Sequence, residues 1–222
     1  MLSLAIDVTR LRTALVVGPA ATEHASLGRL AQLEAASSSA HADIQIFAPA
    51  PGIALAGRAG DRLIRRLPTP ADLAGIRLMF IAGLDEAPSA SLAAAARAAG
   101  ALVNVEDRAG LCDFHMPALV RRGSLQIAIT TEGRAPGLAG HIRRHLDKLF
   151  PGDWAAWLDE LAGLRLLWRA EGADRGSIRR RSEAHIDRRG WLSWPRDDVS
   201  QASPAGRQAT REAYDRRWSH PA

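Results

Sequence analysis

Short apolar runs alternate with longer amphipathic or alanine-rich segments through the first half of the chain. Each run is rich in branched aliphatic residues and ends at or beside a glycine, a proline or an acidic residue, which is typical of a buried strand. We predict strands at residues 10–17, 43–47, 77–82 and 101–105, and helices at residues 22–34 and 89–99. Strands that alternate with helices at this spacing predict an α/β protein with a parallel, doubly wound sheet.

Two stretches of this half lack a clear period. Residues 35–40 are small and polar, so we expect a loop. Residues 53–75 contain only a brief apolar stretch, followed by several arginines and two prolines. We interpret residues 53–75 as a surface connection.

The pattern changes after residue 117. Residues 118–121 and 125–130 are two strand-like runs separated by Arg-Gly-Ser, which favours a hairpin. Apolar positions three and four apart then predict helices at residues 136–150, 153–170 and 177–188. The 6 tryptophans all lie beyond residue 150, so this part carries a packing surface of its own. Residues 195–222 are polar and rich in arginine, and we expect them to be poorly ordered unless a partner holds them.

Composition narrows the class of protein. A hydrophobic content of 47% is enough for a packed core, yet no apolar run approaches the roughly 18–20 residues of a membrane span. Cys112 is the only cysteine, which agrees with a reducing compartment, so we expect a cytoplasmic protein without a membrane partner. The net charge of +5 comes almost entirely from arginine. Because no aromatic residues are interleaved with the arginine clusters, we do not expect nucleic-acid binding.

Two chemically distinctive segments follow predicted strands. The strand at residues 101–105 ends at Glu106 and Asp107, and the strand at residues 125–130 runs into Thr-Thr-Glu-Gly-Arg-Ala-Pro. Open α/β folds bind ligands at the carboxyl ends of their strands. A turn of hydroxyls and free backbone N–H groups ahead of a helix suits an anion, although threonines that merely cap the helix would explain the same residues.

These segments resemble the bifunctional precorrin-2 dehydrogenase and sirohydrochlorin ferrochelatase family, the N-terminal part of siroheme synthase. The matching pieces occur in order: N-V-x-D at residue 104, F-x-M-P at 114, T-T-x-G-x-A-P at 130 and L-F-P at 149. The resemblance implies NAD-dependent oxidation of precorrin-2, insertion of Fe²⁺ as a substrate, or both, in a homodimer. It also implies three parts: a Rossmann-like dinucleotide-binding domain (residues 1–115), dimerisation strands and a helix (116–150), and a helical C-terminal domain with an Arg-rich tail (151–222).

The resemblance also places the cofactor across three turns. The residues expected to bind NAD are Gly18, Ala20, Ala21, Thr22, Pro49, Ala50 and Gly83. The family's glycine-rich turn is altered here, because Ala20 and Glu23 stand where the second and third glycines would be, and Pro19 lacks a backbone donor. The second strand is also not followed by the acid that commonly binds the cofactor's ribose. A tetrapyrrole-binding or chelatase-only protein that has lost NAD is therefore the alternative.

Asp107 is the predicted catalytic residue, since the family credits the aspartate of N-V-x-D with proton transfer in both reactions. Oxidation of precorrin-2 removes a hydride and a proton, and a nearby carboxylate can accept that proton. The alternative for Asp107 is a helix N-cap or a solvated loop acid. The residues predicted to bind the substrate are His115, Thr130, Thr131, Gly133 and Arg134. His141 and His145 lie one helical turn apart, but no third ligand is visible, so we predict no resident metal.

Overall fold

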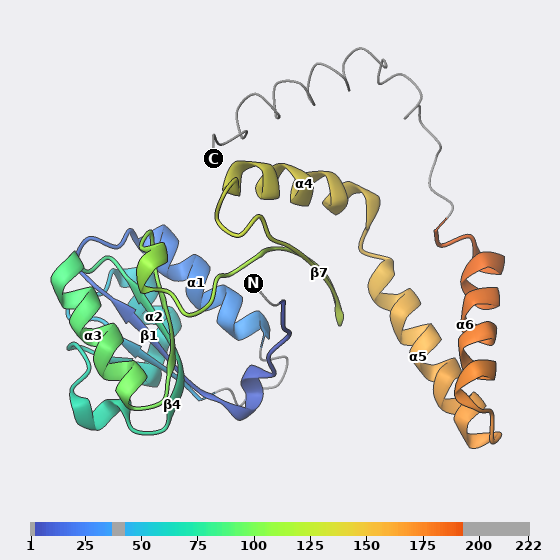
Figure 1. Ribbon diagram of the computed structural model, residues 1–222, viewed down its shortest axis with the longest axis horizontal. Coiled ribbons are helices and arrows are strands. Elements are labelled where there is room, and N and C mark those ends of the chain that lie inside the picture. Colours follow the sequence, from blue (N-terminus) through green and yellow to red (C-terminus); the bar gives the residue numbers. More distant parts are fainter. Residues whose placement is uncertain (1–2, 37–42, 193–222) are drawn as a thin grey trace, which may run out of the picture. The chain divides into compact units, whose positions relative to one another are not determined.

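A five-stranded parallel sheet forms the centre of the N-terminal half of the chain (Figure 1). The structure is a computed structural model that describes residues 3–36 and 43–192. The strands are β1 Arg12–Val17, β2 Ile44–Phe47, β3 Leu63–Ile64, β4 Ile76–Ala82 and β5 Leu102–Val105. They run in the order β3-β2-β1-β4-β5, and every neighbouring pair is parallel. The α/β class and the parallel, doubly wound sheet predicted from the sequence are confirmed.

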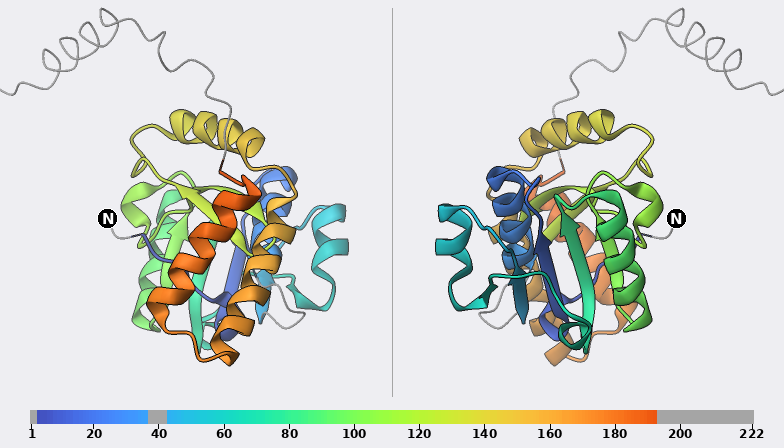
Figure 2. Two further views of the ribbon diagram at one scale, coloured as in Figure 1. Left: turned by 90° about the vertical axis from the view of Figure 1, so that its right-hand side faces the viewer. Right: turned by 90° about the vertical axis from the view of Figure 1, so that its left-hand side faces the viewer.

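Helices cover both faces of this sheet (Figures 1 and 2). The helices α1 (Glu23–Ala36) and α2 (Ile53–Ala59) lie on one face, and α3 (Glu86–Ala98) lies on the other. Consecutive residues of β1 point to opposite layers, so Leu15 and Val16 are both fully buried but belong to different core clusters. Burying one such side chain stabilises the fold by about 1.5–3 kcal/mol. Burial on both faces explains why the central strands β1 and β4 are nearly continuous apolar runs rather than alternating ones.

Residues 53–75 contain regular structure, and the prediction of a surface connection there is wrong. They form α2, the edge strand β3 and two 3-10 helices, η2 (Gly60–Arg62) and η3 (Pro70–Leu73). Leu55 is 1% exposed and packs in the α1 layer, so burial against the sheet stabilises a helix too short to give a periodic signal. Arg66 donates to both carboxylate oxygens of Asp72, at 2.6 and 2.9 Å, and holds the pKa of that carboxyl far below its usual range.

The strand order reverses between β1 and β4, and this is the topological switch point of the sheet. Two neighbouring parallel strands there send their connections to opposite faces, which opens a crevice at their carboxyl ends. β1 ends at Val17 and β4 ends at Ala82, so the turns at Gly18 and Gly83 lie next to each other. β5 pairs with β4 on the other side and delivers the residues after Val105 to the same edge.

Contacts among the described residues group the chain into two compact units. The first contains residues up to 118 together with 128–142, and the second contains 119–127 together with residues from 143 onward. The three-part division expected from the sequence stays a prediction. Two further 3-10 helices belong to the first unit, η1 (Val8–Arg10) and η4 (Ala109–Leu111).

The hairpin predicted after residue 117 is present. It consists of β6 (Ala118–Arg122) and β7 (Leu125–Ile129), which form a two-stranded sheet. The helix α4 (Pro136–Leu149) follows. Arg122 donates to the carboxylate of Asp147 at 2.8 Å and to the backbone carbonyl of Phe150, so its guanidinium fastens the hairpin to the end of α4.

The last two helices form an antiparallel pair (Figure 1). They are α5 (Trp154–Ala170) and α6 (Arg175–Arg189). Trp157 of α5 stacks on Trp191 with ring centroids 5.4 Å apart, and His185 of α6 packs edge-on against the same Trp191 ring at 5.2 Å. The three helices predicted beyond residue 135 are thus confirmed, whereas the tail expected to be poorly ordered lies outside the described residues. None of the helices in residues 3–36 and 43–192 has the length and apolar character that a membrane span requires.

Glu160 of α5 forms hydrogen bonds with two side chains of α6, and these contacts predict that the stability of the helix pair depends on pH. Arg189 and His185 donate to its two oxygens at 2.8 and 3.0 Å, and the Arg189 hydrogen bond lowers the pKa of Glu160 below its ordinary 4.5. A carboxyl whose pKa is lower in the folded state adds stability above the ordinary value and loses it as the pH falls below. Wild type should therefore melt at a higher temperature than Glu160→Gln at pH 6, and the difference should shrink towards pH 3. An unchanged difference across this range would contradict the assignment.

Candidate active site

The turns after β1 and β4 close directly onto each other through their backbones. The N–H of Gly18 donates to the carbonyl of Ala82 at 2.7 Å, and the N–H of Ala20 donates to the carbonyl of Gly83 at 3.0 Å. A Cβ on Gly83, whose φ is +64°, would lie 2.0 Å from the backbone nitrogen of Ala21. Glycine is therefore required here by both the left-handed backbone and the lack of space. The structure brings four of the predicted cofactor residues together at the switch point: Gly18, Ala20, Ala21 and Gly83.

The start of α1 offers backbone donors beside this turn. The Thr22 hydroxyl accepts from the N–H of Ala25 at 3.2 Å, as an N-cap does. The N–H groups of Glu23 and His24 have no hydrogen-bond partner within the described residues. Unpaired amides and the helix dipole at such an end favour an anion, and the pyrophosphate of a dinucleotide is one. The residues at this turn therefore fit NAD in spite of the altered glycine pattern.

The carboxylate of Glu23 is directed to a different place from the one its sequence position suggested. Its Oε1 accepts from the N–H of Ala54 at 2.8 Å and from the N–H of Leu55 at 3.2 Å, both in the first turn of α2. Gly52, which precedes α2, provides no side-chain cap, and a Cβ there would lie 2.2 Å from Glu23 Oε1. The carboxylate is therefore turned towards α2, and it is not directed at an anion bound by the N–H groups at the start of α1.

The remaining predicted cofactor residues, Pro49 and Ala50, lie in the loop between β2 and α2. Ala50 and its neighbour Pro49 are exposed. The Glu23 bonds to α2 tie this loop to the turn after β1. The three turns expected to border the cofactor are therefore connected in one unit by backbone contacts and one carboxylate.

Asp107 lies in a tight turn at the end of β5. The N–H of Glu106 donates to the carbonyl of Ile81 at 2.9 Å, which extends the pairing with β4 by one residue. The N–H of Arg108 then returns to the carbonyl of Val105 at 3.3 Å, and Asp107 between them has a φ of +56°. For most residues other than glycine this region costs about 1–2 kcal/mol, aspartate and asparagine are better tolerated there, and such conformations are concentrated at functional sites. The exposed carboxylate is thus held in a strained backbone at the edge where ligands bind.

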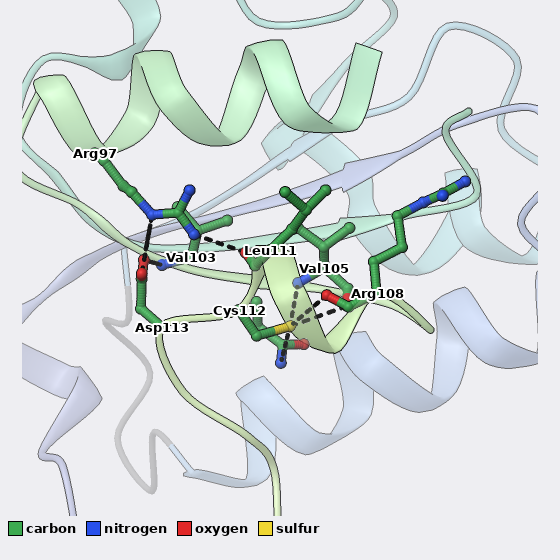
Figure 3. A network of polar contacts seen from close by, with 8 residues as sticks. Arg97, Val103, Val105, Arg108, Leu111, Cys112 and Asp113 are labelled. Atoms are coloured by element: carbon green, nitrogen blue, oxygen red, sulfur yellow. Dashed lines mark hydrogen bonds and ion pairs between the residues drawn. The ribbon is translucent and has the colours of Figure 1, made fainter. Parts of the chain in front are cut away.

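A network of polar contacts holds the Asp107 turn (Figure 3). The Sγ of Cys112 lies 3.2 Å from both the nitrogen and the oxygen of Val105 and 3.4 Å from the carbonyl of Arg108. The Asp113 carboxylate accepts from the Val103 N–H at 2.8 Å and from Arg97 of α3 at 2.9 Å. The segment after β5 is therefore folded back along the outer edge of that strand.

Asn104 and Arg29 complete the surroundings of the turn. The amide of Asn104 donates to the carbonyl of Phe114 at 2.9 Å. Arg29 of α1 lies over the Phe80 ring at 5.4 Å. Burial lowers the pKa of its guanidinium, and the nearby Glu106 and Cys112 oppose that shift. The sequence pattern does not identify Arg29, Asn104 or Cys112 as site residues, and the one signal available is a polar residue within a buried strand, Asn104.

The strained backbone at Asp107 predicts an order of stability among its variants. Asp107→Gly should leave the free energy of unfolding unchanged or raise it by up to about 1 kcal/mol, because glycine adopts positive φ without strain. Asp107→Asn should match wild type, whereas Asp107→Ala should lose about 1 kcal/mol. Chemical denaturation of the four proteins measures the order. Equal stability of the alanine and glycine variants would show that the backbone there carries no strain.

The threonine turn before α4 is ordered by its own hydroxyls. The Thr130 hydroxyl accepts from the N–H of Glu132 at 3.1 Å, and the Thr131 hydroxyl accepts from the N–H of Ala135 at 3.2 Å. Glu132 and Gly133 both have positive φ, +52° and +76°. The capping interpretation of the threonines therefore has direct support, while each hydroxyl keeps its own hydrogen to donate to a ligand. This turn belongs to the same compact unit as Asp107, and the substrate-binding roles of Thr130, Thr131, Gly133 and Arg134 stay predictions.

The histidines are not gathered into a metal centre in the part of the chain that the structure describes. His115 is half-buried and makes no hydrogen bond within the described residues. His141 and His145 lie on α4, and no group of three His, Cys, Asp or Glu side chains there could hold a metal ion. The predicted role of His115 towards the substrate is untested by these contacts.

A glycine turn, a capped helix N-terminus and a strand-end carboxylate at the switch point of a parallel sheet are typical of a Rossmann-type dinucleotide-binding protein. The chain belongs to the family of putative NAD(P)-binding proteins, whose family model matches residues 4–118. A second model, for the central part of sirohaem biosynthesis proteins, matches residues 122–149. The two matches lie in the order that the sequence motifs indicated, and the resemblance to the N-terminal part of siroheme synthase is confirmed.

Individual relatives agree with this assignment. The chain is 35% identical over 113 residues to a siroheme synthase of Methylococcus capsulatus, and 39% identical over 116 residues to one of Pseudomonas putida. These matches cover 51% and 52% of this chain and 24% of each relative, so the chain spans about a quarter of their length. The solved structure of SirC, a precorrin-2 dehydrogenase, has the same fold with a TM-score of 0.67 and 16% identity, over 97% of this chain and 100% of that one.

Proposed function

We propose that this protein oxidises precorrin-2 to sirohydrochlorin with NAD as the hydride acceptor. The observation that carries the proposal is Asp107, an exposed carboxylate held at positive φ on the ligand-binding edge of an NAD(P)-binding sheet. The names of the relatives and of the structural neighbour, siroheme synthase and precorrin-2 dehydrogenase, supply the substrate. The oxidation removes two hydrogens, one as a hydride and one as a proton.

The residues of this chain would bind the cofactor and accept the proton. When bound, NAD supplies the hydride acceptor. The residues Gly18, Ala20, Ala21 and Thr22, with the Pro49-Ala50 loop and Gly83, would border the cofactor, and the N–H groups of Glu23 and His24 would bind its pyrophosphate. The Asp107 carboxylate accepts the proton from the substrate carbon framework or from its pyrrole nitrogens, as a general base. Arg108 forms an ion pair with Glu86 at 3.3 Å, so this neighbouring cation is directed to α3 and not to Asp107.

The proposed substrate, precorrin-2, is a tetrapyrrole macrocycle that carries many acetate and propionate groups, and cationic and hydroxyl side chains would bind them. Arg134 can pair with a carboxylate, and the hydroxyls of Thr130 and Thr131 can donate to one. Gly133 leaves room beside them, since a Cβ there would meet nothing within 4 Å, and His115 is a further candidate for contact with the substrate. We further propose a cytoplasmic homodimer. Leu166 and Leu167 of α5, which are 65% and 61% exposed, support a second copy as the partner of that surface.

Insertion of Fe²⁺ into sirohydrochlorin is the second candidate activity, with the metal as substrate. It rests on the same residue, because metal insertion also requires a base that removes pyrrole protons. A chelatase that does not use NAD is the alternative, and the turn after β1 supports it because few backbone donors are free there to bind a pyrophosphate. Pro19 has no N–H, and the N–H of Ala21 donates to the carbonyl of Gly18 at 3.2 Å.

An anaerobic assay separates these activities. Purified protein is mixed with precorrin-2, with or without NAD, and sirohydrochlorin is followed by its absorbance. A parallel reaction contains sirohydrochlorin and Fe²⁺. The proposal predicts oxidation that requires NAD. Metal insertion without any NAD-dependent oxidation would favour the chelatase-only protein instead.

A further inference from the structure

Two departures from the dinucleotide-binding pattern meet at one point in the structure. Glu23 stands at the third glycine position of the turn after β1, and no acid follows β2. In Rossmann domains an acid at the end of the second strand binds the ribose hydroxyls of the cofactor. Here the side chain of Glu23 crosses from the start of α1 to the start of α2, directly after the β2 loop, where its Oε1 lies 2.8 Å from the Ala54 nitrogen. The misplaced acid thus reaches the region where an acid is missing.

We propose that Glu23 binds the adenosine ribose of NAD and discriminates against NADP. The inference rests on the proposed use of NAD and adds the residue that selects it. Glu23 Oε1 is held by two backbone amides, which fixes the carboxylate, whereas Oε2 has no hydrogen-bond partner within the described residues. A fixed carboxylate oxygen with a free lone pair is the acceptor that a ribose 2′-hydroxyl requires.

The charges around the Glu23 carboxylate favour NAD, whose adenosine ribose has a free 2′-hydroxyl, over NADP, whose ribose carries a 2′-phosphate. A 2′-phosphate adds nearly two negative charges beside Glu23, and like charges brought together are strongly unfavourable. Arginines could offset that repulsion, but three of those between residues 58 and 66 are already paired. Arg58 and Arg62 bind Glu34, each at 2.7 Å, and Arg66 binds Asp72 at 2.6 Å. Their charge is therefore largely compensated before any cofactor binds.

Capping of α2 is a purely structural explanation for the same contacts, and the choice of variant separates the two. Glu23→Gln keeps an amide oxygen that can accept from Ala54 and Leu55, so α2 stays capped while the charge is lost. Glu23→Ala removes the cap as well and should cost about 1 kcal/mol of stability. Asp61→Asn is the matched control, since it removes one exposed carboxylate of the same unit, at η2, that makes no hydrogen bond within the described residues.

The test is a direct binding titration of NAD and of NADP to wild type, Glu23→Gln and Asp61→Asn, with thermal melting of each protein. Wild type and Asp61→Asn should bind NAD at least about tenfold more tightly than NADP, where tenfold corresponds to 1.4 kcal/mol. Glu23→Gln should melt at the same temperature as wild type and bind NAD several-fold more weakly. It should also lose most of the preference for NAD over NADP.

The other outcomes overturn distinct claims. If wild type binds NAD but Glu23→Gln keeps the same ratio of affinities, or weakens both cofactors equally, Glu23 is only a cap and the inference is wrong. If wild type binds neither cofactor, the proposed use of NAD fails and the role of Glu23 fails with it.

Discussion

Asp107→Asn should slow the oxidation of precorrin-2 by about 100- to 10,000-fold, the range that one positioned acid or base contributes. Asparagine has the size of aspartate and tolerates positive φ, so the turn at φ +56° should persist and only the proton acceptor is lost. The affinity for NAD should stay within about twofold of wild type, because the turns after β1 and β4 are untouched. Steady-state rates with both substrates varied, together with an NAD titration, measure these effects.

The adjacent acid provides the control for Asp107. Glu106 is part of the same turn, but its backbone continues the pairing with β4. Glu106→Gln should change the rate by less than about tenfold if proton transfer belongs to Asp107. Should Asp107→Asn oxidise precorrin-2 at the wild-type rate, or should Glu106→Gln be the slower variant, the role given to Asp107 is wrong. If Asp107→Asn also loses Fe²⁺ insertion, one carboxylate serves both reactions.

Gly83→Ala should have the largest effect on the fold, with a loss of about 2–5 kcal/mol of stability and of NAD binding. The left-handed backbone at φ +64° costs an alanine about 1–2 kcal/mol. The new methyl would also lie 2.0 Å from the backbone nitrogen of Ala21, and overpacking costs a further 1–3 kcal/mol. The turns after β1 and β4 must then separate. Chemical denaturation and an NAD titration measure the two losses.

Gly75→Ala isolates the steric part of that effect. Gly75 also has a positive φ, +80°, but a Cβ there would meet nothing within 4 Å. This variant should lose only the conformational term of about 1 kcal/mol and should keep its affinity for NAD. Equal destabilisation by the two alanines would mean that the contact between Gly83 and Ala21 is not as close as described.

Four of the five strands could be predicted from the sequence because each is a mostly apolar run with a clear end. The structure of residues 53–75 could not be predicted, because α2 has only 7 residues and is stabilised by contacts with distant parts of the chain. Its cap is the clearest case: Gly52 has no side chain, and the acceptor comes from Glu23 in another helix. No local pattern reveals such a partner.

Some residues of the candidate site could be predicted from the sequence, and others could not. Gly18, Gly83 and Asp107 could be selected because their roles depend on position at strand ends, which the sequence shows. The network around Cys112, Asp113 and Arg97 could not, because it depends on the return of the chain along β5. The sequence shows Glu23 only as a departure from the glycine pattern, since it gives no direction for the side chain.

The central claim is that precorrin-2 gives its hydride to NAD on this protein. The most direct measurement is the amount of NADH formed when a known amount of precorrin-2 is converted anaerobically, followed by its absorbance together with that of sirohydrochlorin. One NADH should form for each sirohydrochlorin, and none should form without the protein. Sirohydrochlorin that forms at the same rate without NAD, or no conversion with NAD in excess, would contradict it.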